Sequence, residues 1–259
     1  SFWVLFFKIM KKRYFLKNPI TAQQKLKFQR GTHIGLIARK LFPGGIDLSP
    51  PTPFQYPQAV VKTQEAIEAG KEVIYEAAFQ YDSVLVALDI LVKENNAWHA
   101  YEVKSSVKIS NTYLWDAALQ YYVIRNAGLD LKTFSIIYLD KEYKRTKDVA
   151  PIQIFRVQDL TKEISSLQDK LPAIIKEEKE VTLLKHSPDI SIGPHCYNPY
   201  PCDFTNHCWK KIPKNSVFDI PALELNKAFS LFSKNIIHAV DIKDEMLDSP
   251  DELIQRDAL

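Results

Sequence analysis

The amino-acid sequence predicts an α/β fold in which a mixed sheet is flanked by helices. Three apolar segments of strand length, 73–81, 84–92 and 97–104, follow one another with short polar stretches between them, as expected for an antiparallel meander. Segments with helical spacing of apolar residues lie on both sides of the meander, and 134–139 predicts a later strand. With 259 residues, of which 46% are hydrophobic, the chain can bury a substantial core.

The segments before the meander predict a helix, a loop and a second helix. Apolar residues at positions 26, 34, 37, 38 and 41 predict a helix over 24–42, ending before Pro43-Gly44-Gly45. The run Pro50-Pro51-Thr52-Pro53 predicts a loop. Residues 55–69 then predict a second helix, which Gly70 ends.

Residues 84–92 and 97–104 are expected to form a hairpin, because 93–96 (Lys-Glu-Asn-Asn) is polar and has low strand propensity. Side chains two apart on a strand point to the same face, so Glu102 and Lys104 are expected to project together. Asp89, on the neighbouring strand, is expected to lie across from Glu102. A carboxylate inside an almost wholly apolar strand needs a partner or a metal.

Asp89, Glu102 and Lys104 are therefore candidates for a catalytic metal site. Two carboxylates with hard oxygen atoms suit Mg²⁺ or Mn²⁺. Such a metal polarises a phosphoryl oxygen and lowers the pKa of its bound water. Lys104 can orient that water or offset charge on the phosphate. The alternative is a solvated Glu–Lys pair on an exposed strand, which is a common surface feature.

After the meander, the sequence predicts a helix and a strand. Asn111 or Thr112 is expected to cap a helix that runs to about Asn126, with Gly128 as its stop. Residues 134–139 are expected to add the next strand of the sheet.

Two further elements are expected beyond this strand. Residues 152–155 predict another short strand. Asp159 is expected to cap a long helix ending near Glu180.

A series of short motifs runs along residues 11–215, and its order matters more than any single member. The motifs are Arg30-Gly31, Leu41-Phe42-Pro43-Gly44-Gly45, Glu76-Ala77-Ala78-Phe79, Asp89-Ile90-Leu91, Glu102-Val103-Lys104-Ser105-Ser106, Gln120-Tyr121-Tyr122 and Gly193-Pro194-His195-Cys196. In this order they resemble the PD-(D/E)XK nuclease superfamily, specifically its RecB-like and CRISPR-associated exonuclease branch. Within that branch the chain resembles an uncharacterised family of bacterial proteins that carry such a domain at the N-terminus.

This resemblance implies a restriction-endonuclease-like fold and adds two site residues. Gln120, on the helix after the Glu-x-Lys strand, is expected near the active site. The branch usually has a metal-binding His a few residues after a Gly in the first helix. Here Gly35 stands at that His position, and His33 lies two residues earlier, about 200° away around a helix. His33 is thus a secondary metal-ligand candidate, with a capping or solvent-facing role as the alternative.

The cysteines form a second candidate site. The chain has three, with five residues between neighbours: Cys196, Cys202 and Cys208. An odd number of cysteines in a chain that is expected to be cytosolic argues against a disulfide scaffold and for a bound metal or cluster. In the resembling exonucleases, three such cysteines join an N-terminal one around an iron–sulfur ([4Fe–4S]) cluster, clipping the chain ends together. Here Met10 stands at the fourth position. A cluster with a non-cysteine ligand, a Cys₃His Zn²⁺ site using His195 or His207, and a site that holds nothing all remain open.

The charge distribution is uneven. Residues 1–40 contain ten Lys or Arg and no Asp or Glu, whereas the remainder has 24 basic against 31 acidic residues. Tyr14, Phe15 and Phe28 are interleaved with these cations, and this combination suits contacts to phosphates and stacked bases. The alternative is an ordinary solvated helix face.

Composition also predicts location and domain organisation. No apolar run approaches the roughly 20 residues that span a bilayer, and residues 2–7 lack the flanking features of a signal peptide. We expect a cytoplasmic protein with no membrane partner. The predicted domains are a nuclease domain with its cysteine cluster at 1–215, and a helical extension at 216–259 that leads into further domains of a longer chain.

Together these features predict a metal-dependent DNA nuclease, acting as an exonuclease on single strands or duplex ends. Asp89 and Glu102 would hold Mg²⁺ or Mn²⁺, Lys104 would activate or position water, and Gln120 would help to place the substrate. The alternative is a non-catalytic nucleic-acid-binding module that keeps the fold inside a larger protein.

Overall fold

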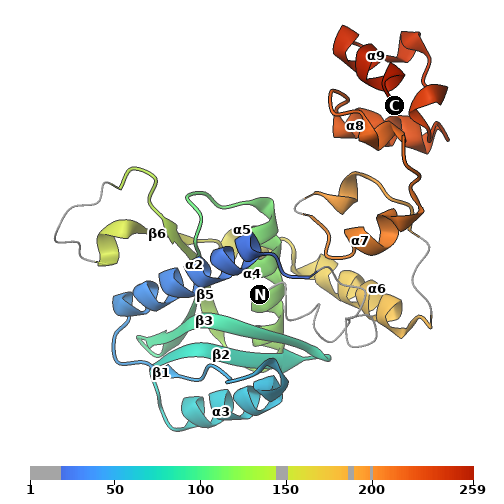
Figure 1. Ribbon diagram of the computed structural model, residues 1–259. Helices are drawn as coiled ribbons and strands as arrows, with labels where there is room; N and C mark the ends of the chain where they lie inside the picture. Colours follow the sequence, from blue (N-terminus) through green and yellow to red (C-terminus); the bar gives the residue numbers. More distant parts are fainter. Residues whose placement is uncertain (1–18, 144–150, 186–189, 199–200) are drawn as a thin grey trace. The chain divides into compact units, whose positions relative to one another are not determined.

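The computed structural model of the protein describes residues 19–143, 151–185, 190–198 and 201–259 (Figure 1). These residues divide into a larger compact unit built on 20–184 and a smaller one built on 185–259. The cysteine-containing segment belongs to the smaller unit. The predicted domain boundary after residue 215 stays a prediction.

The larger unit is an α/β structure with a six-stranded mixed sheet, so this part of the predicted fold class is confirmed. The strands follow the chain order across the sheet: β1 (Ile46–Asp47), β2 (Val73–Tyr81), β3 (Val84–Glu94), β4 (Ala97–Lys104), β5 (Leu131–Leu139) and β6 (Phe155–Asp159). Strands β2, β3 and β4 form the predicted antiparallel meander. The β1–β2 and β4–β5 pairs are parallel, and β6 runs antiparallel to β5.

Helices flank both faces of this sheet. They are α2 (Ala22–Ala38) with the 3₁₀ turn η2 (Arg39–Leu41), α3 (Tyr56–Glu68), α4 (Asn111–Asn126), α5 (Thr161–Ser165) and α6 (Leu171–Leu183). Helix α2 packs Ala38 into a cluster with Tyr75 and Ile90 on one face. Helix α4 crosses the opposite face (Figure 1), where its apolar residues join a larger cluster that includes Leu88 and Phe134. The helix predicted over 24–42 and the one predicted over 55–69 are confirmed.

The hairpin turn between β3 and β4 is shorter than predicted. Strand β3 continues through Lys93 and Glu94, which pair with β4. Only Asn95 and Asn96 form the turn, with φ of 49° and 62°. Two-residue hairpin turns need this left-handed conformation, and Asn adopts it at low cost. The polar character of 93–94 therefore reflects exposure of the strand end and not a loop.

Two details of α4 and β5 differ from the prediction. The N-cap of α4 is Ser110 and not Asn111 or Thr112, because the Ser110 hydroxyl accepts a hydrogen bond from the Tyr113 amide at 3.3 Å. Strand β5 begins at Leu131, three residues before the predicted start. The predicted end of the helix is confirmed, since Gly128 follows it with φ of 98°.

The prediction was wrong about the last part of the larger unit. Residues 151–154 form a 3₁₀ turn, and β6 begins only at Phe155. The long helix expected after Asp159 is broken: α5 ends at Ser165, and α6 starts at Leu171 with Pro172 in its first turn. Proline lacks an amide hydrogen and its ring clashes with the preceding turn, so it is tolerated where a helix begins but not in its interior.

The smaller unit is built from short helices. It comprises η6 (Pro194–Cys196), α7 (Thr205–Cys208), η7 (Trp209–Lys211), η8 (Val217–Asp219), α8 (Leu225–Ser233), η9 (Ala239–Asp241), η10 (Asp244–Met246) and α9 (Pro250–Asp257). Trp209 contacts the rings of Tyr197, Phe218 and Phe229, so the cysteine-containing segment shares a core with the helices that follow it. Within the described ranges, none of the helices combines the length and apolar composition that crossing a membrane requires.

Candidate metal-binding active site

The register of the central strands brings Asp89 and Glu102 together as predicted. Ile90 pairs with Tyr101, which places Asp89 opposite Glu102 on the neighbouring strand. The Val103 amide donates a hydrogen bond to Asp89 Oδ2 at 2.6 Å. The Asp89 side chain therefore takes an amide proton that a strand carbonyl would normally accept, and it is held in place beside Glu102.

Glu76 on β2 extends this pair to a row of three carboxylates, Glu76, Asp89 and Glu102, which we call the carboxylate row. Tyr75 pairs with Ile90 and Ala77 with Leu88, which places Glu76 opposite Asp89. Glu76 has a φ of 56°, and such a conformation in a non-glycine residue costs on the order of 1–3 kcal/mol.

On β2 and β3, the alternation of side chains between the two faces of the sheet is interrupted at the carboxylate row. Leu88 and Ile90 are two residues apart on β3, yet Leu88 belongs to the apolar cluster under α4 and Ile90 to the cluster under α2. Ala77 and Tyr75 on β2 divide in the same way. Two-residue alternation therefore breaks on β2 and β3 at the candidate site, whereas on β4 it holds for Glu102 and Lys104.

The environment of Asp89 is strongly acidic. Burial, followed by the charges of Glu102 and Glu76, holds the pKa of Asp89 well above its ordinary value, although Lys104 and the Val103 amide act in the opposite direction. A carboxylate in this setting needs either a proton or a cation. The hard oxygen atoms of Asp89 and Glu102 suit Mg²⁺ or Mn²⁺.

These side chains are not gathered into a finished coordination sphere. In the part of the chain that the structure describes, no three His, Cys, Asp or Glu side chains form a ready-made metal-binding group. Arg39 Nη2 lies 3.1 Å from Glu76 Oε1, and Lys104 Nζ lies 2.8 Å from Glu102 Oε1. Each of these two carboxylates thus already contacts a cationic side chain, which a metal ion would have to compete with.

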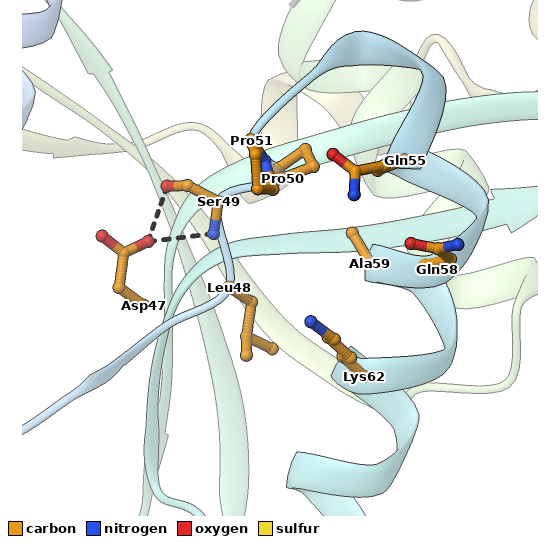
Figure 2. Close-up of a pocket in the computed structure, with 9 residues that line it drawn as sticks. All are labelled: Asp47, Leu48, Ser49, Pro50, Pro51, Gln55, Gln58, Ala59 and Lys62. Atoms are coloured by element: carbon orange, nitrogen blue, oxygen red, sulfur yellow. Dashed lines mark hydrogen bonds between the residues drawn. The ribbon is translucent and has the colours of Figure 1, made fainter.

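Arg39 also connects the carboxylate row to a small pocket. Its Nη1 lies 2.5 Å from Asp47 Oδ2, while Asp47 Oδ1 accepts hydrogen bonds from the amide and hydroxyl of Ser49 (Figure 2). The pocket has a volume of about 120 Å³ and is lined by Asp47, Leu48, Ser49, Pro50, Pro51, Gln55, Gln58, Ala59 and Lys62. None of Glu76, Asp89 and Glu102 lines it. We therefore place the candidate site at the carboxylate row and not in this pocket.

Lys104 projects from the same face of β4 as Glu102, as predicted, and its ammonium bridges two carboxylates. Its Nζ lies 2.8 Å from Glu102 Oε1 and 2.5 Å from Asp116 Oδ2 on α4. Burial by itself would lower the pKa of Lys104, but the charges of Glu102 and Asp116 outweigh it and raise the pKa above its ordinary value. Lys104 therefore stays protonated near neutral pH. It can orient a water molecule or offset negative charge, but it cannot accept a proton.

Asp116 was missed in the sequence analysis, whereas Gln120 was a predicted site residue and is fully buried. Burial raises the pKa of Asp116, but the charge of Lys104 acts in the opposite direction with smaller contributions that include Gln120, and the pKa is lowered overall. Gln120 is 0% exposed. Neither of its amide atoms has a hydrogen-bond partner of normal geometry among the described residues. Its predicted contact with substrate stays a prediction.

The remaining candidates lie apart from the carboxylate row. His33 is exposed on α2, and no hydrogen bond or ion pair joins it to Glu76, Asp89 or Glu102 in the described residues. Its ligand role stays a prediction. Helix α2 also carries exposed cations at Lys25, Lys27 and Arg30, while the basic residues before position 19, together with Met10, lie outside the described residues.

In the smaller unit, Cys196 and Cys208 lie near enough to Cys202 to influence its pKa, but within the described residues the three cysteines do not form a ready-made metal-binding group. Cys196 is buried, Cys202 half-buried and Cys208 exposed, and the Cys202 amide donates to the Cys196 carbonyl at 2.8 Å. Burial raises the pKa of the Cys202 thiol, and the neighbouring Cys196 and Cys208 raise it further. The cluster, zinc and metal-free alternatives stay open.

Two of the missed residues carried a signal in the sequence. Glu76 interrupts the apolar run 73–79, and Asp116 interrupts the apolar stretch 113–124. This is the signal that singled out Asp89.

The sequence was compared with protein-family models and with curated proteins, and it matches none of either.

Proposed function

We propose that this protein is a metal-dependent nuclease of the PD-(D/E)XK type, with a restriction-endonuclease-like fold, that hydrolyses DNA phosphodiester bonds. One observation carries the proposal. Asp89, a carboxylate with a strongly raised pKa, lies in register between Glu76 and Glu102, next to a lysine that stays charged. Nearby acidic side chains disfavour one another's ionised forms, and a divalent cation relieves this repulsion.

Asp89 and Glu102 are the residues that would hold Mg²⁺ or Mn²⁺. The metal would polarise the phosphoryl group and lower the pKa of its bound water. Lys104 would contribute a fixed positive charge that orients the water or stabilises charge developing on the phosphate. Because its pKa is raised, Lys104 would not serve as the general base.

The proposed substrate is single-stranded DNA or a duplex end. The exposed Lys25, Lys27 and Arg30 of α2 support this, since cationic side chains of this kind contact phosphates. We further propose that the cysteines hold an iron–sulfur ([4Fe–4S]) cluster or Zn²⁺ that has a structural role. The cytoplasmic location and the further domains of a longer chain also stay predictions.

The test is cleavage of end-labelled single-stranded and duplex DNA by the full chain, with Mg²⁺, with Mn²⁺ and with excess chelator. We expect cleavage only with a metal ion, and loss of cleavage in Lys104→Ala. Lys132→Ala is a matched control, because Lys132 is an exposed lysine on the neighbouring strand β5. Cleavage that persists in chelator, or equal rates for the two variants, would contradict the proposed mechanism.

One observation favours a second function, that of a non-catalytic nucleic-acid-binding module. Glu76 and Glu102 each contact a cationic side chain, and no ready-made metal-binding group exists in the described residues. Wild-type protein that binds DNA but cleaves it with neither metal would support this module and reject the nuclease.

A further inference from the structure

The ammonium of Lys104 is shared between the sheet and α4, and this sharing bears on the proposed metal site. Its Nζ lies 2.8 Å from Glu102 Oε1, 2.5 Å from Asp116 Oδ2 and 5.3 Å from the centroid of the Tyr113 ring. A lysine ammonium has three N–H donors, and the neighbours of this one are two carboxylates and one aromatic ring. One of these carboxylates is proposed to hold the metal, and the other belongs to the helix.

Asp116 and Gln120 form an unusual buried polar pair. They lie one turn apart on α4 and so share a face of the helix. The Asp116 side chain is 5% exposed and Gln120 is 0% exposed. Within the described residues, Asp116 Oδ1 and both amide atoms of Gln120 lack a hydrogen-bond partner of normal geometry. Buried polar atoms without partners are rare and costly, so packing alone does not explain these two side chains.

We propose that Asp116 and Gln120 are positioning residues for Lys104, an inference that rests on the proposed metal site. Asp116 draws the ammonium toward α4, and the buried amide of Gln120, one turn along the same helix face, is placed to orient the Asp116 carboxylate. If Asp116 were uncharged, Lys104 would pair with Glu102 alone and would compete with a divalent cation for the Glu102 oxygen atoms. The second carboxylate thus keeps a charged lysine beside the metal site and limits this competition.

The test is a double-mutant cycle read out as Mn²⁺ affinity by titration calorimetry in the absence of DNA. We expect Asp116→Asn to weaken Mn²⁺ binding by about 10–100-fold, the usual range for residues that support metal ligands. Gln120→Met should weaken it in the same direction. In a Lys104→Ala background, Asp116→Asn should no longer change the affinity, because the ammonium that it positions is gone.

The matched control is Asp130→Asn, which removes the same charge from an exposed position before β5 and should leave Mn²⁺ affinity unchanged. Equal weakening by Asp116→Asn in both backgrounds would show a direct effect of charge on the metal and would overturn the inference. Mn²⁺ affinity that Asp116→Asn leaves unchanged in protein that retains Lys104 would overturn it as well. If Asp116→Asn does not fold, Gln120→Met in both backgrounds carries the same test, and if Lys104→Ala does not fold, Lys104→Met removes the ammonium while keeping most of the apolar side chain.

This experiment separates the inference from the proposed function. Wild-type protein that shows the expected coupling but cleaves no DNA would reject the nuclease and support the positioning role. DNA cleavage that depends on Lys104, combined with no coupling between Asp116 and Lys104, would reject only the positioning role. Wild-type protein that binds no Mn²⁺ would reject both, because they share the metal site.

Discussion

Removal of the Lys104 ammonium should destabilise the larger unit strongly, whatever its effect on catalysis. Lys104 is 13% exposed, and its partners Glu102 and Asp116 are 3% and 5% exposed. Lys104→Ala leaves both carboxylates buried without the cation that they share. Loss of one partner of a buried ion pair leaves an uncompensated buried charge, which costs more than the ion pair contributed in the intact protein.

The contact distances set the scale of this effect. With an effective dielectric constant near 20, Coulomb's law gives roughly 6 kcal/mol for each contact at about 2.8 Å. Truncation also removes the cost of desolvating the lysine, so the net loss is smaller. We expect about 3–5 kcal/mol, the usual cost of breaking a buried pair by removing one partner. For a unit of this size, that corresponds to a fall in melting temperature of about 6–20 °C.

The loss should depend on pH with a definite sign. The folded-state pKa of Asp116 is lowered, so its contribution to wild-type stability is present above its unfolded pKa and is lost as pH falls through the folded value. The pKa of Lys104 is raised, so its contribution is present below its unfolded pKa and is lost as pH rises through the folded value. The difference between wild type and Lys104→Ala should therefore be largest near neutral pH. It should narrow toward acidic pH, where the Asp116 carboxyl takes up a proton and the ammonium no longer stabilises it.

Urea unfolding of metal-free protein, followed by circular dichroism across this pH range, measures the difference. Lys132→Ala is the control, and it should change stability by less than about 0.5 kcal/mol because its side chain is exposed. A Lys104→Ala loss no larger than that of the control would refute the buried bridge. A loss that stays constant from neutral to acidic pH would refute its electrostatic origin.

The remaining predictions concern Asp89 and the cysteines. Because the folded-state pKa of Asp89 is raised, its neutral form stabilises metal-free protein below the unfolded pKa, and this stability is lost as pH rises through the folded value. The urea midpoint of wild type should therefore fall as pH rises, whereas that of Asp89→Asn should not. Added Mn²⁺ should restore the lost stability of wild type and leave Asp89→Asn unchanged. Equal effects of Mn²⁺ on the stability of both proteins would contradict this. For the cysteines, elemental analysis of anaerobically purified protein should find bound iron or zinc that Cys202→Ser loses, with a lower melting temperature in the variant. Absence of both metals from wild type, together with an unchanged melting temperature in Cys202→Ser, would show that the cysteines hold no metal.

Local patterns in the sequence were enough to predict the elements around the candidate site. The apolar strands 73–81, 84–92 and 97–104 were read from composition and turn residues, because a strand needs only its own side chains and its ends to be recognised. The two-residue period of a strand placed Glu102 and Lys104 on one face, and the hairpin then placed Asp89 near Glu102. These inferences involve residues that are close in sequence.

Tertiary packing decided what the local patterns left open. Asp116 reaches Lys104 only because α4 packs on the face of the sheet that carries Glu102, and the sequence pattern of α4 alone does not show which strand its polar residues will meet. Glu76 joins Asp89 because β2 adopts a positive φ at this residue and changes phase there, against the alternation that sequence reasoning assumes. The protonation of Lys104 was decided in the same way, since a pKa depends on burial and on charges brought close in space. Sequence therefore singled out the candidate site residues on β3 and β4, and the packing of β2 and α4 against them determined the charge of the candidate site.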